Sequence, residues 1–395
     1  MSSWVGVVVL LAIIACAHCS FDGKWFTEFG VVDVTTRHDA FTVECLEKES
    51  QSVCWTNTNG HITKGAIHFS GREGKLIDNY LLWDDGNKWT RFDTEENIMF
   101  KVNEHQLVKK CRHGVFLINV HDNMVSKSLN VYGEWSEKEL VIFKEIINEG
   151  DVVIDIGANV GAFTVPFSKM VGPKGLVYAF EPQFHIFQTL CANVALNLRM
   201  NVMTFPFALG DEMGTSNIPR VNYKVDANFG ALSLGKDYQV KGQLAPLVVP
   251  KVTLDSMFEK RDCPKFIKID VEGWETKVLS GALQTLQRCR PLLFVENNQL
   301  KQSRSLIELI SKAGYTIFWV YQPYFNENNF FGVRNNPFPF DLYAINILCI
   351  PNEVRSNYHL NGFVQVYPEQ GRFYFHEYSE ELEALGFRGT MNGQE

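Results

Sequence analysis

Basic clusters are scarce in this sequence, and nucleic-acid-binding proteins normally display a basic face or stripe. The 395 residues include 37 Lys and Arg against 45 Asp and Glu, and the formal net charge is −8. The longest basic cluster is Lys109-Lys110-Cys111-Arg112. We therefore expect no nucleic acid among the partners of this protein.

Metal-binding cysteine patterns and glycosylation sequons are also missing. Of the 9 cysteines, the seven that follow Cys19 form no CxxC or Cys/His pair with the spacing of a zinc site. No Asn-x-Ser/Thr triplet is present, which argues against a heavily glycosylated surface. Cys45 and Cys54 bracket a short polar stretch, so a local disulfide between them is predicted for an oxidising compartment.

Long apolar runs are limited to the N-terminus, where residues 5–17 read VGVVVLLAIIACA. A membrane-spanning helix needs roughly 20 apolar residues, so this run is short for a span. It resembles the central region of a secretory signal peptide, with Ala15 and Ala17 near a cleavage position. We predict a signal peptide over residues 1–19, a secreted or secretory-pathway protein, and no stable membrane span after cleavage. An uncleaved anchor is the alternative.

The rest of the chain has two regions that differ in their pattern of apolar residues. Residues 20–124 have short apolar runs separated by turn clusters, a pattern typical of a small β-rich accessory region of unknown role. From there to residue 352 strands alternate with helices, which predicts an α/β domain with a mostly parallel sheet. Residues 353–395 remain as a C-terminal extension. Among the predicted elements are helices 134–147, 162–170, 184–198, 274–287 and 303–313, and a third strand 201–209.

A glycine-rich turn follows the first predicted strand of the α/β domain, in Asp155-Ile156-Gly157-Ala158-Asn159-Val160-Gly161. In such sheets the ligand lies beyond the carboxyl ends of the strands. The turn lacks the G-x-G-x-x-G pattern of pyrophosphate binders. The carboxylate of Asp155 suits a partly cationic ligand such as S-adenosylmethionine, while Gly157 and Gly161 allow close backbone approach.

Acidic residues end the next two strands. Glu181 closes the second strand, where a carboxylate can accept hydrogen bonds from both ribose hydroxyls of an adenosine ligand. Nicotinamide cofactors share that feature, and a helix-capping acid is the structural alternative. Asp211 follows the third strand and either accepts from the adenine amino group or is a turn residue.

Charged residues also stand at the ends of the fourth and fifth strands. Lys268, Asp270 and Glu272 alternate on an otherwise apolar strand, and Glu296-Asn297 follows the next. Buried charges need partners or a ligand. Their gathering at the carboxyl edge of a parallel sheet indicates a functional site, with a structural salt-bridge network as the alternative.

Several motifs in order resemble the FkbM family of S-adenosylmethionine-dependent methyltransferases. They are VYGEWSEKEL, VVIDIGANVGAF, AFEP, NVALN, ALGD, NFGALSL, FIKIDVEGWETKVLSGA, LLFVEN and FNENNFFG, and they cover residues 125–352. The resemblance implies a Rossmann-like class I fold whose seven-stranded sheet has an antiparallel last strand. It implies methyl transfer, mostly to hydroxyl oxygens. Its cofactor positions match Asp155, Gly157, Asn159, Gly161 and Glu181.

For the reaction we expect an O-methyltransferase acting on a sugar-like or small hydroxylated acceptor. Asp270, Glu272 and Glu296 are the candidate catalytic residues, because an acceptor hydroxyl must lose its proton. A divalent cation held by Asp270, Glu296 and Asn297 is a second hypothesis, since hard cations prefer oxygen ligands. A ligand-binding or scaffolding protein on the same fold, and a nicotinamide dehydrogenase, are the other functional classes.

Overall fold

The structure is a computed structural model of the chain. It describes the backbone of eight strands between residues 23 and 91, and then residues 98–231, 246–334, 336, 338, 342–358, 360, 363–378 and 381. The predicted signal peptide and the predicted Cys45–Cys54 disulfide lie outside the residues or side chains described. Within the described part of the chain, no helix is both long and apolar enough to cross a membrane.

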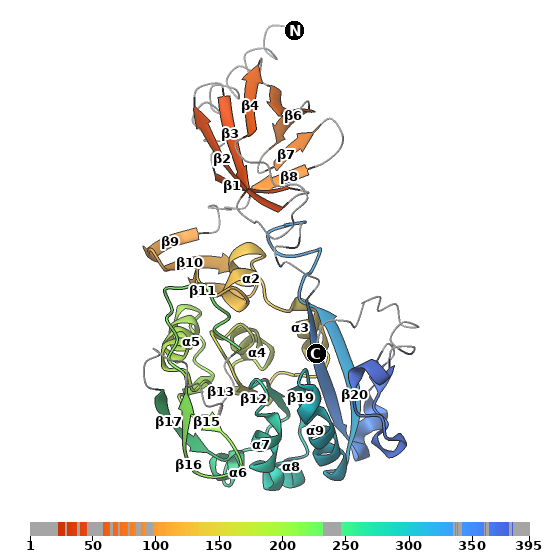
Figure 1. Ribbon diagram of the computed structural model, residues 1–395. Coiled ribbons are helices and arrows are strands. Elements are labelled where there is room, and N and C mark those ends of the chain that lie inside the picture. The colour runs from red at the N-terminus through yellow and green to blue at the C-terminus, as the bar shows by residue number, and fades with distance from the viewer. Residues whose placement is uncertain are drawn as a thin grey trace. The chain divides into compact units, whose positions relative to one another are not determined.

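The described residues fall into two compact units that divide between Ile98 and Met99, with 327–340 grouped with the first. The first unit contains a closed antiparallel barrel of eight strands (Figure 1). The barrel confirms the β-rich character predicted for this part of the chain. Its strands are β1 Gly23–Thr27, β2 Gly30–Arg37, β3 Ala40–Cys45, β4 Thr58–Thr63, β5 Ala66–Phe69, β6 Arg72–Ile77, β7 Tyr80–Trp83 and β8 Lys88–Arg91.

The second unit is built around an eight-stranded sheet in the order β14-β13-β12-β18-β19-β21-β20-β22. Neighbours from β14 to β19 are parallel, and β21 runs antiparallel to both β19 and β20. This order is that of a class I methyltransferase sheet, extended by the two-residue edge strand β22. The strands are β12 Val152–Ile156, β13 Leu176–Phe180, β14 Val202–Phe205, β18 Phe266–Ile269, β19 Leu292–Glu296, β20 Tyr315–Pro323, β21 Tyr343–Pro351 and β22 Val364–Gln365.

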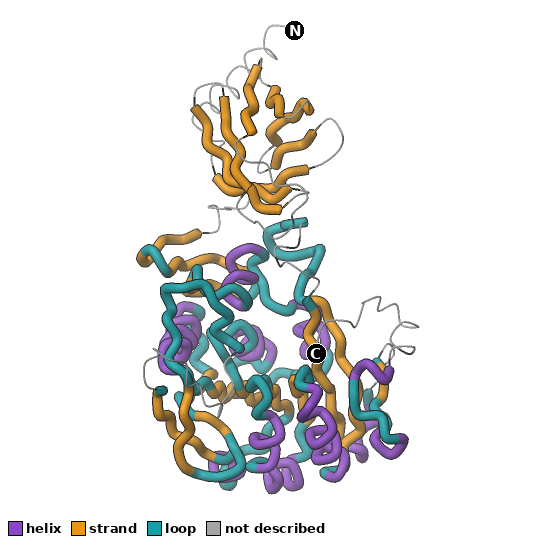
Figure 2. The backbone as a smooth tube through the Cα atoms, viewed as in Figure 1, coloured by secondary structure: helices purple, strands orange, loops and turns teal. Residues whose placement is uncertain are grey.

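Helices cover both faces of this sheet (Figure 2). On one face the side chains of Val153, Phe266 and Phe294 pack with α3 and α4. On the other face Ile154, Ile267 and Val295 pack with α6 to α9. The helices are α2 Val125–Val131, α3 Glu137–Lys144, α4 Thr164–Met170, α5 Phe184–Leu196, α6 Leu254–Phe258, α7 Glu275–Ser280, α8 Leu283–Cys289 and α9 Leu300–Lys312.

Two predicted elements are divided in the structure. The helix predicted over 274–287 is two helices, α7 and α8, separated at Gly281 and Ala282. The strand predicted over 201–209 becomes β14 in the main sheet and β15, Ala208–Leu209, in a small separate sheet with β16 Gly214–Ile218 and β17 Leu247–Val252. Pro206 lies between β14 and β15 and has no N–H for a ladder hydrogen bond, which ends the first strand.

A three-stranded sheet joins the α/β unit ahead of residue 125, where the sequence placed the domain boundary. It consists of β9 Ile98–Asn103, β10 Gln106–Cys111 and β11 Gly114–Asn119. Asn193 in α5 and Asn197, which caps the C-terminus of that helix, are four residues apart and bind the backbone of β11. The Leu117 N–H donates to Asn193 Oδ1 at 2.6 Å, and the Val115 N–H donates to Asn197 Oδ1 at 2.9 Å.

The described part of the C-terminal extension also belongs to the α/β unit. It contains three 3-10 helices, Asn352–Asn357, Pro368–Gln370 and Phe375–Tyr378, in addition to β22. Val364 in β22 pairs with Trp319 of β20, and Tyr378 is fully buried in the core beneath that strand. The extension therefore contributes core contacts to the fold.

Candidate functional site

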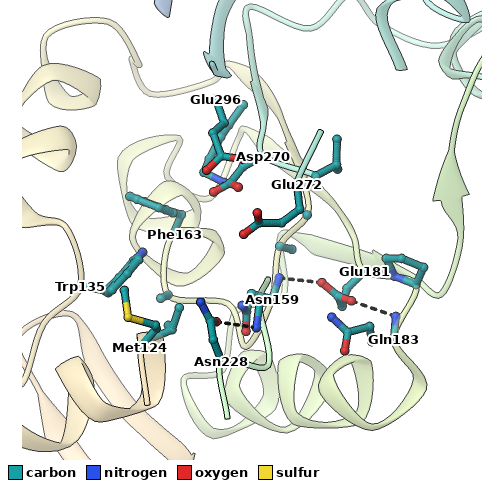
Figure 3. Close-up of a pocket in the computed structure, with 18 of the residues that line it drawn as sticks. Met124, Trp135, Asn159, Phe163, Glu181, Gln183, Asn228, Asp270, Glu272 and Glu296 are labelled. Carbon is teal, nitrogen blue, oxygen red and sulfur yellow. Dashed lines mark hydrogen bonds and ion pairs between the residues drawn. The ribbon is translucent and has the colours of Figure 1, made fainter. Parts of the chain in front are cut away.

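A pocket opens at the carboxyl ends of the parallel strands, where an α/β sheet places its ligand. It contains six of the residues that the sequence assigned to cofactor binding or catalysis (Figure 3). The lining residues are Met124, Val125, Trp135, Gly157, Ala158, Asn159, Ala162, Phe163, Glu181, Pro182, Gln183, Ile218, Asn228, Gly230, Lys268, Asp270, Val271, Glu272, Glu296 and Tyr324.

The glycine turn after β12 forms the floor of this pocket. Gly157 has φ +78°, and a Cβ atom there would lie 1.8 Å from the Asp270 carbonyl oxygen. Gly161 has φ +86°, and a Cβ atom there would lie 2.9 Å from Leu190 Cδ1 of α5. The first glycine thus lets the turn approach the end of β18, and the second lets it approach a helix. Gly161 is not among the residues that line the pocket.

Glu181 connects the glycine turn to the start of α5. Its carboxylate accepts the Asn159 N–H at 3.0 Å and the Gln183 N–H at 2.8 Å (Figure 3). The side chain is only 4% exposed, and burial raises its pKa to about 7 although both hydrogen bonds oppose the rise. Each oxygen retains acceptor capacity toward the pocket, so the geometry is compatible with a ligand that offers hydroxyl donors.

Asp155 lies beneath the pocket and does not line it. Alternation along β12 points this side chain to the same face as Val153, where α4 lies. There it is fully buried, accepts from Thr164 Oγ1 at 2.6 Å, and lies 3.8 Å from Lys268 Nζ. Asp155 therefore does not lie where it was predicted to contact a cationic ligand. It supports the glycine turn from below through Thr164 and Lys268.

Lys268, near the end of β18, lies between the carboxylates of Asp155 and Asp270. Its ammonium lies 3.0 Å from Asp270 Oδ2 and 5.0 Å from the ring centroid of Phe163. Burial opposes the charge of this lysine, but Asp270 and Asp155 together raise its pKa above the usual value. The charged strand end predicted from the sequence thus forms an ion-pair network and reaches the pocket at the same time.

Asp270, Glu272 and Glu296 come together at the pocket wall, with one oxygen of each within 4.8 Å of the others. Asn297, the third oxygen ligand expected from the sequence, is not in this group and does not line the pocket. Its backbone N–H continues the pairing of β19 by donating to the Ile345 carbonyl at 2.9 Å. Since strand side chains alternate, Asn297 and Glu296 point to opposite faces.

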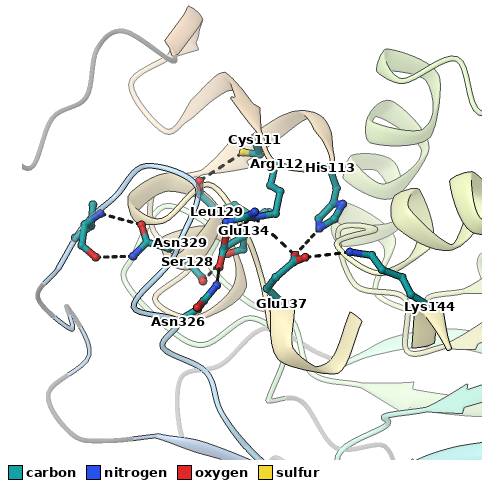
Figure 4. Close-up of polar contacts among 11 residues, drawn as sticks. Cys111, Arg112, His113, Ser128, Leu129, Glu134, Glu137, Lys144, Asn326 and Asn329 are labelled. Atoms are coloured by element: carbon teal, nitrogen blue, oxygen red, sulfur yellow. Dashed lines mark hydrogen bonds and ion pairs between the residues drawn. The ribbon is translucent and has the colours of Figure 1, made fainter. Parts of the chain in front are cut away.

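An aromatic pair, Trp135 and Tyr324, lines another wall of the pocket. Their rings stack with centroids 4.8 Å apart. The segments that carry them are tied together, because Asn326 Nδ2 donates to Glu134 Oε1 at 2.7 Å and Arg112 binds the other oxygen of Glu134 (Figure 4). Tyr324 directly precedes the FNENNFFG motif and Trp135 lies within VYGEWSEKEL, two motifs that are far apart in the chain.

The segment after β16 covers another side of the pocket through Asn228 and Gly230. Asp122 accepts the Phe229 N–H at 3.3 Å, and Gln183 Nε2 donates to the Phe229 carbonyl at 3.0 Å. Asp211, by contrast, pairs with Lys277 at 2.6 Å and is not among the lining residues. In this structure Asp211 is a salt-bridged turn residue.

Residues 155–317, which contain the glycine turn, Glu181 and the acidic cluster, match the family model described as the methyltransferase FkbM domain. This segment is an FkbM methyltransferase domain. The FkbM match runs from the end of β12 to the start of β20, and Trp135, which precedes α3 in the chain, also lines the pocket.

Two curated relatives are similar to parts of the chain. The chain is 39% identical over 79 residues to a tRNA(Phe) (4-demethylwyosine(37)-C(7)) aminocarboxypropyltransferase of Methanocaldococcus jannaschii, covering 20% of this chain and 30% of that protein. It is 26% identical over 171 residues to the hexuronic acid methyltransferase AglP of Haloferax volcanii, covering 43% and 65%. The chain thus spans less than two thirds of the length of either relative.

Solved methyltransferase structures are also similar to the chain. A methyltransferase FkbM from Methylobacillus flagellatus KT has a TM-score of 0.33 at 15% identity, covering 58% of this chain and 55% of that one. An S-adenosylmethionine-dependent O-methyltransferase from Thermotoga maritima has a TM-score of 0.33 at 11% identity, covering 70% and 94%.

Proposed function

We propose that this protein is an S-adenosylmethionine-dependent methyltransferase that methylates a hydroxyl oxygen of a sugar-like or small hydroxylated acceptor. The observation that carries the proposal is the convergence of Glu181, the Gly157 turn and three carboxylates in one pocket of an FkbM domain. The similarity to a protein named as a hexuronic acid methyltransferase supports a sugar-like acceptor.

The residues of the pocket fit this cofactor. Glu181 offers two carboxylate oxygens to which ribose hydroxyls would donate. Gly157, with φ +78°, has no side chain to obstruct a ligand at the turn. The excess of carboxylates over Lys268 favours a ligand with cationic groups. The glycine turn would hold the methionine part of the cofactor and Glu181 its ribose.

The bound cofactor supplies an electrophilic methyl group on a sulfonium, so that transfer forms a carbon–oxygen bond, breaks a carbon–sulfur bond and leaves a neutral thioether. The protein's part is mainly to position the acceptor in line with that methyl group. The stacked rings of Trp135 and Tyr324 offer a flat apolar surface for a sugar face. A carboxylate oxygen of the acidic cluster accepts the proton that the acceptor hydroxyl releases.

The same pocket argues against a polyanionic acceptor. Asp270, Glu272 and Glu296 stand on its acceptor side, and Lys268 is engaged by two aspartates. These carboxylates would repel the phosphate groups of a nucleic acid that approached the pocket. We therefore propose a small-molecule or glycan acceptor rather than nucleic acid, although one relative is a tRNA-modifying enzyme.

We also propose that the protein enters the secretory pathway. The apolar segment at residues 5–17 supports this location, and so does a disulfide between Cys263 and Cys289. Disulfides are rare in reducing compartments. This location requires that the cofactor be imported into the compartment.

The test combines cofactor binding with methyl transfer. Calorimetry should detect S-adenosylmethionine binding to the purified protein, and Glu181→Ala should weaken it by about 1–3 kcal/mol, the scale of a lost charge-assisted hydrogen bond. The exposed Glu145→Ala, which removes the same charge, should leave the affinity unchanged.

Labelled cofactor should then transfer its methyl group to members of a panel of glycans, polyols and small hydroxylated metabolites. Binding without transfer to any acceptor would favour a scaffolding protein on the same fold. Absence of binding at millimolar cofactor would contradict the proposed function as a whole. Binding of NADH, seen by fluorescence, would favour a dehydrogenase.

A further inference from the structure

The carboxylates of Asp270, Glu272 and Glu296 point toward one another at the pocket wall (Figure 3). They reach this point from two adjacent strands, because β18 and β19 are parallel and end at the same edge of the sheet. Glu272 follows β18 with φ +53°, so the chain turns sharply there and directs its side chain back toward the pocket. One oxygen of each residue lies within 4.8 Å of the other two.

Glu296 supplies a second observation that points to a ligand. Its side chain is 9% exposed, and its Oε1 accepts from Asn298 Nδ2 at 2.7 Å. Its Oε2 is buried and has no hydrogen-bond partner among the described residues. A buried carboxylate oxygen without a partner is costly, so a bound cation at this oxygen would stabilise the site.

Lys268 does not meet this need. Its ammonium lies 3.0 Å from Asp270 and 3.8 Å from Asp155, a fully buried carboxylate that depends on it. The positive charge of Lys268 is thus divided between two aspartates on the α4 side of the cluster. The unpartnered oxygen of Glu296 still lacks a counter-charge.

We propose that Asp270, Glu272 and Glu296 bind one hard divalent cation of the Mg²⁺, Mn²⁺ or Ca²⁺ class. Two oxygen ligands of one such ion lie at most about 4–5 Å apart, since metal–oxygen distances are about 2.0–2.6 Å. The three carboxylate oxygens all lie within 4.8 Å of one another, so they are close enough to share one ion. The three ligands are all oxygens, a set that does not favour zinc. Water and acceptor hydroxyls would complete the coordination. A role of the cation in activating that hydroxyl rests on the proposed function, but the binding of the cation does not.

The experiment is a titration of the chelator-treated full chain with Mn²⁺, followed by the loss of the free-ion electron paramagnetic resonance signal. We expect one bound ion per chain, displaced by excess Mg²⁺ or Ca²⁺. Glu296→Gln and Asp270→Asn should each weaken binding at least tenfold. The matched control Glu145→Gln removes an exposed carboxylate and should bind like the wild type. Glu272→Gln, in a partly exposed turn, tests the same site if a strand-end variant fails to fold.

Absence of saturable Mn²⁺ binding up to millimolar concentration would overturn the inference, as would unchanged binding in all variants that fold. Cofactor calorimetry in excess EDTA separates this result from the proposed function. If the protein binds the cofactor but not Mn²⁺, the proposed cation site is wrong and the proposed methyltransferase function still stands. If the protein binds Mn²⁺ but not the cofactor, the proposed cation site is supported and the proposed methyltransferase function is contradicted.

Discussion

Among single residues, Lys268 contributes to the stability of the fold through its buried ammonium, which neutralises a buried carboxylate. It is 3% exposed and lies 3.8 Å from Asp155 Oδ1, in a side chain that is fully buried. Lys268→Met should destabilise the protein by about 3–5 kcal/mol, because removal of one partner leaves a buried carboxylate without its counter-charge. Denaturant unfolding monitored by circular dichroism measures the change.

The control for Lys268→Met removes the carboxylate as well. The double variant Lys268→Met with Asp155→Asn should recover part of the lost stability, since the substituted amide is neutral and Thr164 can still bind it. If the double variant is no more stable than Lys268→Met, the two side chains do not form a coupled pair.

Protonation of Glu181 should make cofactor affinity dependent on pH. Burial raises its pKa to about 7, so in the free protein the side chain becomes largely protonated as the pH falls below that value. A ribose needs the ionised form with two acceptor oxygens. Affinity measured by calorimetry should therefore fall up to tenfold for each pH unit between 7 and 5, and level off above pH 8.

The pH dependence of stability that Glu181 causes is opposite to that of cofactor binding: stability falls, whereas affinity rises, as the pH increases. The pKa of Glu181 is about 7 in the folded protein against 4.5 for the free side chain, so the folded state favours the protonated form. Its ionisation has no effect on stability below pH 4.5 and destabilises the free protein increasingly as the pH rises to 7. Glu181→Gln should remove this part of both pH profiles. Identical profiles in the variant would show that another group is responsible.

At the scale of elements, the break between α7 and α8 brings two backbone segments together. A Cβ atom on Gly281 would lie 2.0 Å from the Gly210 carbonyl oxygen, which belongs to the turn after β15. Gly281→Ala should therefore destabilise the protein by about 1–3 kcal/mol, the usual cost of overpacking. Thermal unfolding measures this cost, and Gln284→Ala, at an exposed position of α8, is the control with an expected change near zero.

The alternation of strand side chains explains why charges converge at one edge. Along β12, β18 and β19 the residues Val153, Phe266 and Phe294 face α3 and α4, and two positions later stand Asp155, Lys268 and Glu296. The spacing of two places all three charges on the same face, just where the strands end. The sequence therefore predicted a polar strand edge, and this prediction is confirmed.

For the whole molecule, the secretory location predicts both processing and a disulfide. Expression in a secreting eukaryotic host should yield a protein whose N-terminus starts near Ser20, as determined by mass spectrometry. The same preparation should contain a peptide that joins Cys263 to Cys289. An intact N-terminus at Met1 together with free thiols at both positions would contradict the secretory location.

The linear sequence was enough to predict the alternation of strands and helices, the glycine turn and the acid at the end of β13. These features depend on periodicity and on residues close to one another in the chain. The resemblance to the FkbM family is carried by the same local motifs, and the match over residues 155–317 confirms it.

Tertiary structure alone decided which of these residues meet. It grouped Glu272 rather than Asn297 with Asp270 and Glu296, paired Cys263 with Cys289, and brought Trp135 to Tyr324. The last two pairs join residues far apart along the chain, and the choice of Glu272 depends on a sharp turn. Such contacts are set by the packing of helices and strands against one another, and local residue patterns carry little information about that packing.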